Sequence, residues 1–386
     1  MTAGRAEIYL DHNSTTPLLD VARTAMLEAM EQAWANPSSV HAAGRRAWTR
    51  VEGLCQTLGQ VADVDPRDTV LTASGTEANN LALHGACAVV TSRLEHPSVV
   101  RVVEALQARG RPVRWLPVPE SGWINPQTVG RALEELPAGT TVALMAANHE
   151  TGVIQPVREV ADIARRCRAR LHVDAVQAVG KLPAAMWNVG HSVTVAAHKI
   201  GGPKGIGALL WRGAAPAPLV LGGQQQRGLR AGTLDPVAAA GFQAALIHAH
   251  AGGPERYERL GELRDRLEAA VACQTDVNGA RAPRLPHVSS LSVRGWRSDA
   301  VVAALDLAGV RISSGSACSS GSAQPSPVIE SMLGIERARS SIRISLGEST
   351  TLAQMACAIE ELLRAFRRQP CSSSGEGSSP AGYPTS

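Results

Sequence analysis

Residues 170–211 read RLHVDAVQAVGKLPAAMWNVGHSVTVAAHKIGGPKGIGALLW. This stretch contains three short apolar runs, 170–173, 192–196 and 208–211, whose length and β-branched residues predict buried strands. Asp174 follows the first run directly, and Lys199 lies just beyond the second. Loops at the carboxyl ends of parallel strands carry the ligand-binding groups of open α/β sheets. The stretch therefore predicts a sheet and also the edge of that sheet where a site would lie.

The same alternation extends toward the N-terminus. Helical spacing of apolar residues marks 19–34 and 38–61, and four further strand-like runs follow at 69–72, 88–92, 113–117 and 141–146. Strands that alternate with helices are typical of a mostly parallel sheet. We predict an α/β fold with a mostly parallel seven-stranded sheet flanked by helices.

The pattern changes at Gly252-Gly253-Pro254. Beyond it, strand-like runs at 288–293, 310–313 and 341–346 are mixed with helical segments at 260–271, 298–307 and 351–366, which predicts a smaller α+β domain. We place the large domain at 15–253 and the small domain at 1–14 together with 254–371. Residues 372–386 are mostly Ser, Gly and Pro, and such a composition predicts a disordered tail.

Composition excludes several classes of protein. The 386 residues are 44% hydrophobic with a net charge of +4, and no apolar run has the length of a membrane span. The seven cysteines are scattered without a Cys-x-x-Cys pair, so neither a disulfide framework nor a metal site is expected. The densest basic cluster, within 165–170, is typical of a solvated helix face. We expect a cytoplasmic protein without a direct nucleic-acid partner.

Only three of the 38 basic side chains are lysine: Lys181, Lys199 and Lys204. A lysine amine can act as a nucleophile once it loses its proton, whereas a guanidinium stays protonated. Chance retention explains at least two of the three, because Lys181 follows a glycine in a connection and Lys204 lies in a Pro-Lys-Gly turn. Lys199 follows a strand, so it is the preferred candidate for a Schiff-base amine.

Three strand ends carry complementary chemistry. Ser74-Gly75-Thr76-Glu77 opens a helix whose first amides could bind an anion, although Ser and Glu at this spacing also form an ordinary helix cap. Asp174 could keep a pyridinium nitrogen protonated, or could cap a helix. With Lys199 as the amine, these groups are the set that pyridoxal phosphate requires.

From Ile8 to about Phe366 the chain resembles the cysteine desulfurases of the iron-sulfur-cluster assembly type, which belong to the fold-type I pyridoxal-phosphate enzymes. The matching motifs, in the family's order, are YLDHNSTTP (9–17), NPSS (36–39), TEANN (76–80), EH (95–96), NHETG (148–152), HVDAVQ (172–177), HKIGGPKG (198–205), GLRAGT (228–233), SSGSAC (313–318) and SSIR (340–343). Several motifs in one order are more specific than any single motif.

The resemblance implies roles for individual residues around pyridoxal phosphate. Gly75, Thr76 and His198 would contact the phosphate, and Thr233 would contribute from the second subunit of a homodimer. His96 would stack on the pyridine ring and transfer protons.

Further roles follow for the phenolic oxygen and the substrate. Asn148 and Gln177 would hydrogen-bond near the phenolic oxygen. Arg343 would bind the carboxylate of the substrate, with Asn148 close by. Independently of the resemblance, the planar guanidinium of an arginine can bind a carboxylate through two hydrogen bonds. The competing interpretation is that Arg343 is an ordinary surface arginine.

Cys318 lies in a run of small polar residues, 313–322, that we expect to be exposed and mobile. By the resemblance, its thiolate attacks the sulfur of bound L-cysteine, keeps that sulfur as a persulfide, releases L-alanine and passes the sulfur to an acceptor protein such as an iron-sulfur scaffold. Without the surrounding motifs, an unremarkable loop cysteine would be an equal interpretation.

Two departures from the family pattern matter. The family has a serine that donates to the phosphate where this chain has Ala196, so one hydrogen bond to the cofactor is missing. The segment between the Thr76 helix and the strand at Ala88 is also short.

A selenocysteine lyase, or another class-V aminotransferase-type enzyme in which Cys318 is dispensable, remains the alternative. A cofactor-poor interaction protein is a second alternative, which Ala196 alone supports.

Overall fold

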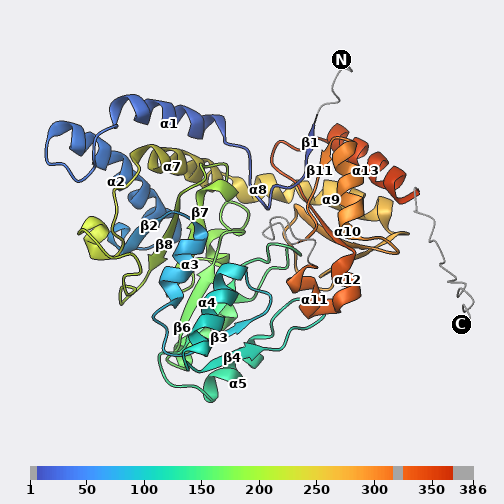
Figure 1. Cartoon of the computed structure of the whole chain (residues 1–386), viewed down its shortest axis with the longest axis horizontal. Coiled ribbons are helices and arrows are strands. Elements are labelled where there is room, and N and C mark those ends of the chain that lie inside the picture. Colours follow the sequence, from blue (N-terminus) through green and yellow to red (C-terminus); the bar gives the residue numbers. More distant parts are fainter. Residues whose placement is uncertain (1–6, 316–324, 368–386) are drawn as a thin grey trace, which may run out of the picture.

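The computed structural model describes residues 7–315 and 325–367. The strands of its central sheet are β2 (Thr69–Thr72), β3 (Val89–Ser92), β4 (Val113–Leu116), β5 (Thr141–Met145), β6 (Arg170–Asp174), β7 (Ser192–Ala196) and β8 (Gly207–Trp211). Their spatial order is β2-β8-β7-β6-β5-β3-β4 (Figure 1). β8 runs antiparallel to β2 and β7, and the other neighbours are parallel. The predicted mostly parallel seven-stranded sheet is confirmed.

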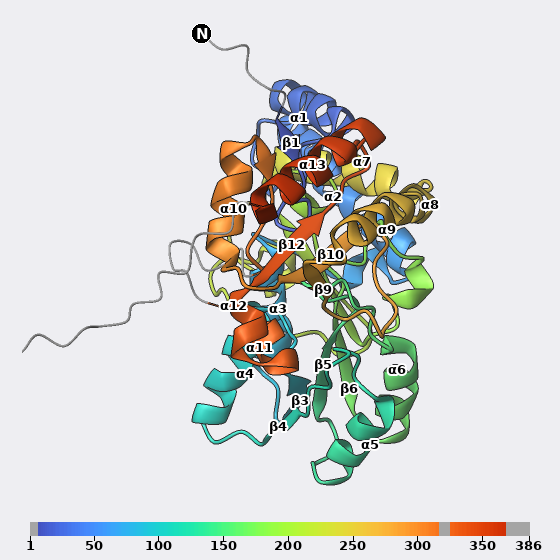
Figure 2. The ribbon, with the colours of Figure 1, turned by 90° about the vertical axis from the view of Figure 1, so that its right-hand side faces the viewer.

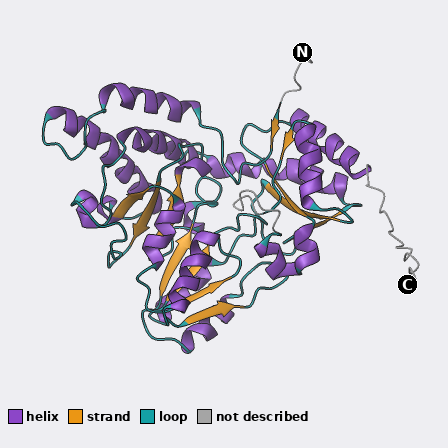
Figure 3. Ribbon diagram, viewed as in Figure 1, coloured by secondary structure: helices purple, strands orange, loops and turns teal. Residues whose placement is uncertain are grey.

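Helices cover both faces of this sheet (Figure 3). One face packs against α3 (Gly75–Leu83) and α4 (Pro97–Ala108), and the other against α2 (Ala42–Ala62), α5 (Pro126–Glu134), α6 (Val157–Arg166) and α7 (Pro236–His250). Successive strand residues point to opposite faces, so Leu209 packs with α3 while Leu210 joins the larger core. α1 (Asp20–Gln32) packs on the outside of α7. Two covered faces explain why the strands consist of buried apolar runs.

A second group of elements has its own core (Figure 2). Its sheets are the antiparallel order β12-β10-β9, from β9 (Thr275–Val277), β10 (Val288–Val293) and β12 (Ser341–Ser345), and the parallel pair β1 (Ile8–Tyr9) and β11 (Val310–Arg311). Its helices are α8 (Gly253–Glu258), α9 (Leu260–Val271), α10 (Ser298–Leu307), α11 (Pro327–Leu333), α12 (Ile335–Arg339) and α13 (Leu352–Arg367). Of these, α11 and α12 place their buried apolar residues in the larger core and not in that of the second group. The domain boundary at residue 253 stays a prediction. The predicted tail lies outside the described residues.

The N-terminal segment connects the two groups. Ile8 pairs with Val310, and Asp11 forms a bridge with Ser345. Two residues later, the Asn13 amide donates to the Ser345 hydroxyl at 2.9 Å. The segment then enters the large group, where the Thr16 amide donates to the His198 carbonyl at 3.0 Å. Residues 8–16 therefore join the small sheet to the end of β7.

Within the described residues, no helix combines the length and the apolar character that crossing a bilayer requires.

Candidate active site

A cavity of about 320 Å³ lies where the carboxyl ends of the central strands face the second group of elements. Eight of the predicted site residues line it: Gly75, Thr76, His96, Asp174, Gln177, His198, Lys199 and Arg343. Asn148 and Thr233 are not part of this lining. Cys318 lies outside the described residues. The structure thus gathers residues that are spread over most of the chain into one cavity.

The first turn of α3 forms one wall of the cavity. The Ser74 hydroxyl accepts from the Glu77 amide at 3.2 Å, and the Glu77 carboxylate accepts from the Ala73 amide at 2.7 Å. The competing interpretation of this motif as a helix cap is therefore correct. It does not exclude anion binding, because the cap fixes Gly75 and Thr76 at the cavity with the helix N-terminus directed at it.

The same wall depends on small residues. A Cβ at Gly207 in β8 would lie 2.8 Å from the carbonyl carbon of Ser74 and 3.0 Å from the amide nitrogen of Gly75. Ala196 also lines the cavity here, and its Cβ lies 3.5 Å from the position a Cβ at residue 75 would take. The residue that replaces the family's serine is therefore next to the anion-binding turn.

Asp174, at the end of β6, is buried and held in place by two donors. Its Oδ2 accepts from the Asn79 side chain at 2.8 Å, and its Oδ1 accepts from the Val176 amide at 3.0 Å. Asn79 is fixed in turn by His172, whose Nε2 lies 3.0 Å from the Asn79 Oδ1. Burial lowers the pKa of His172 to about 4, so this imidazole is neutral and donates through Nε2. A carboxylate with a fixed direction suits a protonated ring nitrogen as its partner.

His96 belongs to the same hydrogen-bond chain. Asn79 donates to the Ser98 hydroxyl at 2.8 Å, and that hydroxyl lies 2.8 Å from the His96 Nδ1. The Ser98 amide also donates to Nδ1 at 3.1 Å. With Nδ1 as acceptor, the imidazole proton is on Nε2. Burial lowers the pKa of His96, the carboxylate of Asp174 opposes this, and Lys199 adds to the lowering, so the ring is neutral near pH 7.

Lys199 ends the single turn 197–199 that follows β7. Its Nζ donates to the carbonyl oxygens of Asn13 at 2.6 Å and Ser14 at 2.7 Å. These carbonyls belong to the segment that joins the two groups of elements. The amine is thus directed into the cavity that also contains Asp174 and the first turn of α3.

Arg343 projects from β12 into the cavity and is 2% exposed. Its Nη2 donates to Asp11 Oδ1 and to the Ser14 hydroxyl, both at 2.7 Å, and its Nη1 donates to the His149 carbonyl at 3.0 Å. The buried Nε has no hydrogen-bond partner among the described residues. The interpretation as a surface arginine is wrong. A buried guanidinium with an unused donor is suited to a carboxylate.

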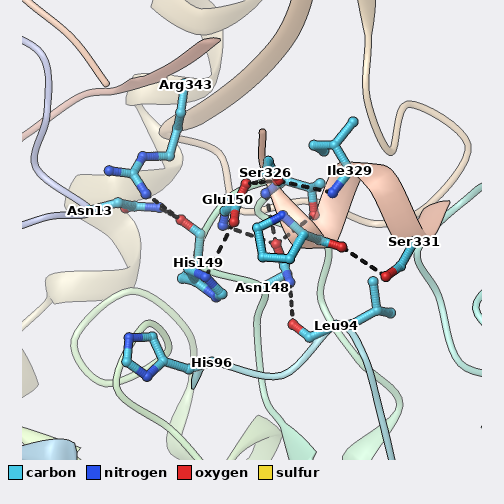
Figure 4. A network of polar contacts seen from close by, with 12 residues as sticks. Asn13, Leu94, His96, Asn148, His149, Glu150, Ser326, Ile329, Ser331 and Arg343 are labelled. Atoms are coloured by element: carbon cyan, nitrogen blue, oxygen red, sulfur yellow. Dashed lines mark hydrogen bonds and ion pairs between the residues drawn. The ribbon is translucent and has the colours of Figure 1, made fainter. Parts of the chain in front are cut away.

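A second imidazole lies beside the first (Figure 4). The rings of His149 and His96 are edge to face with centroids 5.2 Å apart. The buried Glu150 accepts a hydrogen bond from the Ser326 hydroxyl, next to α11 (Figure 4). Burial raises the pKa of Glu150 and lowers that of His149, and both effects favour the neutral forms. The NHETG motif therefore forms the wall between Arg343 and α11.

Two predicted residues have other surroundings. Asn148 is buried, and its amide donates to the Leu94 carbonyl at 2.9 Å and accepts from the amides of Glu150 and Thr151 at 2.9 and 2.8 Å. It shapes the loop behind the cavity, and its contact with cofactor or substrate stays a prediction. Thr233 is exposed and is not part of the cavity lining, and its role in a second subunit also stays a prediction.

Sequence reasoning missed three polar residues. Asn79 lies in the TEANN motif, and its place one helical turn after Thr76 was the available signal. Ser98 follows His96 by two residues and carried no signal of its own. Lys181 is 2% exposed, although we expected an ordinary lysine in a connection. The scarcity of lysine in the chain was the available signal, because it marked Lys181 as one of only three lysines.

The donors of the cavity match the predicted cofactor. The amides of the first turn of α3 and the side chain of His198 could hold its phosphate, Asp174 its ring nitrogen and Lys199 its aldehyde. Burial, together with the charges of Lys199, Lys204 and Lys181, lowers the pKa of His198 to about 4, and an imidazole N–H can donate to a phosphate. The residues present fit pyridoxal phosphate.

Comparisons with known proteins agree with this geometry. The family model for class-V aminotransferases matches residues 8–356. The chain is 38% identical to the IscS-like cysteine desulfurase of Mycobacterium tuberculosis, over 93% of this chain and 96% of that protein. It is 34% identical to the cysteine desulfurase IscS of Dictyoglomus turgidum, over 94% and 95% respectively. A solved structure of a NifS-like protein from Rickettsia africae has a TM-score of 0.84 at 27% identity and covers 94% of this chain and 99% of that one.

Proposed function

The chain belongs to the class-V aminotransferase family and is a pyridoxal-phosphate-dependent cysteine desulfurase, and we propose that it moves sulfur from free L-cysteine, through a persulfide on Cys318, to an acceptor protein. The observation that best supports the assigned site is that Lys199, Asp174, Arg343 and the first turn of α3 line one cavity. An amine, a carboxylate, a guanidinium and an anion-binding turn are all required for an amino acid held on this cofactor.

The first part of the mechanism is the binding of the cofactor. When bound, pyridoxal phosphate supplies an electron sink for the bonds around the α-carbon of the substrate. The amides of Gly75 and Thr76, with His198, would hold the phosphate, and Asp174 would keep a proton on the ring nitrogen. Lys199 would supply the amine for the aldehyde group.

The second part is the handling of the substrate. Arg343 fixes the substrate carboxylate, so the α-carbon has a defined position relative to Lys199. The Nζ of Lys199, which lies in the same cavity, would take the α-proton of the substrate. His96 is neutral with its proton on Nε2, which suits it to a second proton transfer beside the ring.

The third part is the transfer of sulfur. The Cys318 thiolate attacks the sulfur of the substrate, so an S–S bond forms while the Cβ–S bond of cysteine breaks. The electron pair of the broken bond goes to the β-carbon, which takes up a proton. The net change converts one cysteine and the Cys318 thiol into one alanine and a Cys318 persulfide. The small polar residues around Cys318 support this role, because they favour an accessible thiol.

The test is a single-turnover experiment with purified protein, pyridoxal phosphate and L-cysteine. We expect one alanine per active site and a mass increase of one sulfur on the peptide that contains Cys318. Lys199→Ala should abolish both, and Cys318→Ser should abolish the persulfide and alanine release together. Alanine release that survives in Cys318→Ser, with selenocysteine preferred over cysteine, would instead identify a selenocysteine lyase.

We also propose a homodimer in which Thr233 completes the partner's phosphate site. Large apolar side chains are exposed on and next to α1 and α2, among them Met30, Trp34, Val40 and Trp48, and Trp34 is 73% exposed. Several large apolar side chains exposed on neighbouring segments support an interface. Thr233 is exposed as well, and is not part of the lining of its own chain's cavity.

Mixed dimers test this arrangement. Lys199→Ala and Thr233→Ala should each be impaired alone, whereas mixing and reassembly should restore activity. In the mixed dimer, one site contains Lys199 from one chain and Thr233 from the other. A monomer in solution, or no recovery after confirmed mixing, would refute the shared site.

The sulfur acceptor and the cellular compartment are further parts of this proposal. A persulfide carrier requires an acceptor thiol, and we propose an iron-sulfur scaffold protein as its source. The described cysteines, Cys55, Cys87, Cys167, Cys273 and Cys357, are free thiols, which supports a reducing compartment such as the cytoplasm. Transfer of ³⁵S from the loaded protein to a purified scaffold, with a scaffold lacking its cysteines as control, tests the acceptor.

A further inference from the structure

Lys181 is a buried cation that the mechanism above does not use. It is 2% exposed, and burial together with the positive charges of Lys199 and Arg343 lowers its pKa to about 7. Among the described residues, no carboxylate lies within ion-pairing distance of its amine. Burying an ammonium without a counter-ion is unfavourable. We therefore expect Lys181 to have a function that compensates for this cost.

The hydrogen-bond partner of Lys181 is a residue of the cavity wall. The Lys181 Nζ donates to the Gln177 Oε1 at 2.7 Å. On its other side, the Gln177 Nε2 donates to the Asn13 carbonyl at 2.9 Å. The same carbonyl accepts from the Lys199 Nζ at 2.6 Å. Gln177 therefore lies between the buried lysine and the amine of the active site.

Lys181 and the Asn13 carbonyl together favour one orientation of the Gln177 amide. An amide side chain can rotate by half a turn and exchange its oxygen and nitrogen. An ammonium has donors only, so it can face the oxygen of the amide but not its NH₂ group. While the Lys181 amine is protonated, the Gln177 Oε1 faces it, and the Gln177 Nε2 remains on the side of Asn13 and Lys199.

We propose that Lys181 is a positioning residue that acts through Gln177: it holds the amide so that a donor, and not an acceptor, faces the cofactor side of the cavity. The inference rests on the proposed function, in which Gln177 hydrogen-bonds near the phenolic oxygen of pyridoxal phosphate. A donor stabilises negative charge on that oxygen, whereas an acceptor would oppose it. Lys181 touches neither the substrate nor the cofactor.

The remaining neighbours of Lys181 do not provide an alternative anchor. The centroid of the Tyr257 ring is 6.0 Å from the Lys181 Nζ. His12 and His287 also face this region, and burial together with the charge of Lys181 lowers the pKa of both, so they are neutral near pH 7. Among the described neighbours, Gln177 is thus the polar side chain that accepts a hydrogen bond from the Lys181 amine.

The experiment compares Lys181→Met, Gln177→Met and the double variant in the holoenzyme. Arg158→Met, which removes one cation from an exposed position on α6 outside the cavity lining, is the control. Two readouts are measured: the dissociation constant for pyridoxal phosphate, and the midpoint of the pH-dependent change in the cofactor's absorbance band. The melting temperature of each apoprotein separates these effects from altered folding.

We expect Lys181→Met to weaken cofactor binding about tenfold and to raise the absorbance midpoint by about one pH unit, as the loss of one charge-assisted hydrogen bond would. Gln177→Met should have the same two effects. Because Lys181 acts through Gln177, the double variant should resemble Gln177→Met alone. Arg158→Met should leave both readouts unchanged.

Additive effects in the double variant, or a change in melting temperature without a change in the absorbance midpoint, would overturn the proposal. Gln177→Glu provides a test with Lys181 intact. It keeps a partner for the ammonium but removes the donor, so the midpoint should rise at least as far as in Gln177→Met, and an unchanged midpoint would count against the proposal. A wild-type protein that shows no borohydride-reducible band on Lys199 would refute the proposed function instead.

Discussion

At the scale of single residues, position 196 distinguishes the cavity from the family pattern. Ala196 lies beside the first turn of α3, where the family has a serine that donates to the phosphate. We predict that Ala196→Ser lowers the dissociation constant for pyridoxal phosphate about tenfold, because a hydrogen bond to a charged group is added. Cofactor titration of the apoprotein measures this. The neighbouring Ala197→Ser, which does not line the cavity, should give no gain, and equal affinities for Ala196→Ser and wild type would contradict the prediction.

Substitution of Arg343 should affect the binding of the substrate more than the chemical step. We predict that Arg343→Lys raises the KM for L-cysteine by roughly 10- to 100-fold with a smaller effect on kcat, because an ammonium cannot keep the contacts of the guanidinium with Asp11, Ser14 and the His149 carbonyl and also supply the donor that Nε leaves unused. Steady-state kinetics of alanine release provide the measurement. Arg339→Lys, on the exposed side of α12, is the matched control. A normal KM with a reduced kcat would assign Arg343 to another step.

The residues that sequence could identify are those whose chemistry is unusual for their position. Lys199 and Asp174 follow strand ends, where a charged side chain requires an explanation. Asn79 and Ser98 could not be found in this way, because their role is to hold Asp174 and His96 through hydrogen bonds that link α3 with α4 and β6. Such contacts depend on the tertiary arrangement and leave no periodic signal.

At the scale of elements, β8 sets the position of the start of α3. We predict that Gly207→Ala weakens cofactor binding at least tenfold and destabilises the fold by about 1 to 3 kcal/mol, because its Cβ would press on the Ser74–Gly75 backbone. Gly85→Ala, whose Cβ would make an ordinary contact with Ala217 at 3.7 Å, is the control. Denaturation curves and cofactor titration together provide the test. Unchanged binding in Gly207→Ala would show that the turn adapts.

Long, strongly patterned elements were predictable, and short ones were not. Every predicted strand of the central sheet is present, with ends that differ by at most one residue, as for 88–92 against Val89–Ser92. The two-residue strand β1 and the three-residue strand β9 were missed. β1 exists because Ile8 and Tyr9 pair with Val310 and Arg311, far along the chain, and no local pattern encodes that pairing.

At the scale of the whole molecule, buried histidines determine the response to acid. Burial lowers the pKa of His12, His172 and His198 from 6.5 to about 4 in the folded state. The unfolded chain therefore binds more protons between these values, and the stability that these groups contribute above pH 6.5 is lost as the pH falls toward 4. Glu95 and Glu150, whose pKa values burial raises, oppose part of this effect.

We predict a lower free energy of unfolding at pH 5 than at pH 7.5, measured by chemical denaturation with and without pyridoxal phosphate. His172→Gln should reduce the difference between the two pH values, because it removes one of the groups that must gain a proton on unfolding. His250→Gln, at an exposed position, should not. A free energy that rises on acidification would show that the buried glutamates dominate.

The segment that joins the two groups of elements also has a consequence for biosynthesis. Asp11 bonds to Arg343, and Asn13 bonds to Ser345, in each case across 332 residues of chain. A ribosome-bound nascent chain can bury the central sheet long before β12 has emerged from the exit tunnel, whereas contacts at such a sequence separation form late. Arg343 therefore takes its place only after β12 has emerged. A nascent chain that is still shorter than this can contain the central sheet but lacks the guanidinium of the cavity, so it cannot yet bind the substrate carboxylate there.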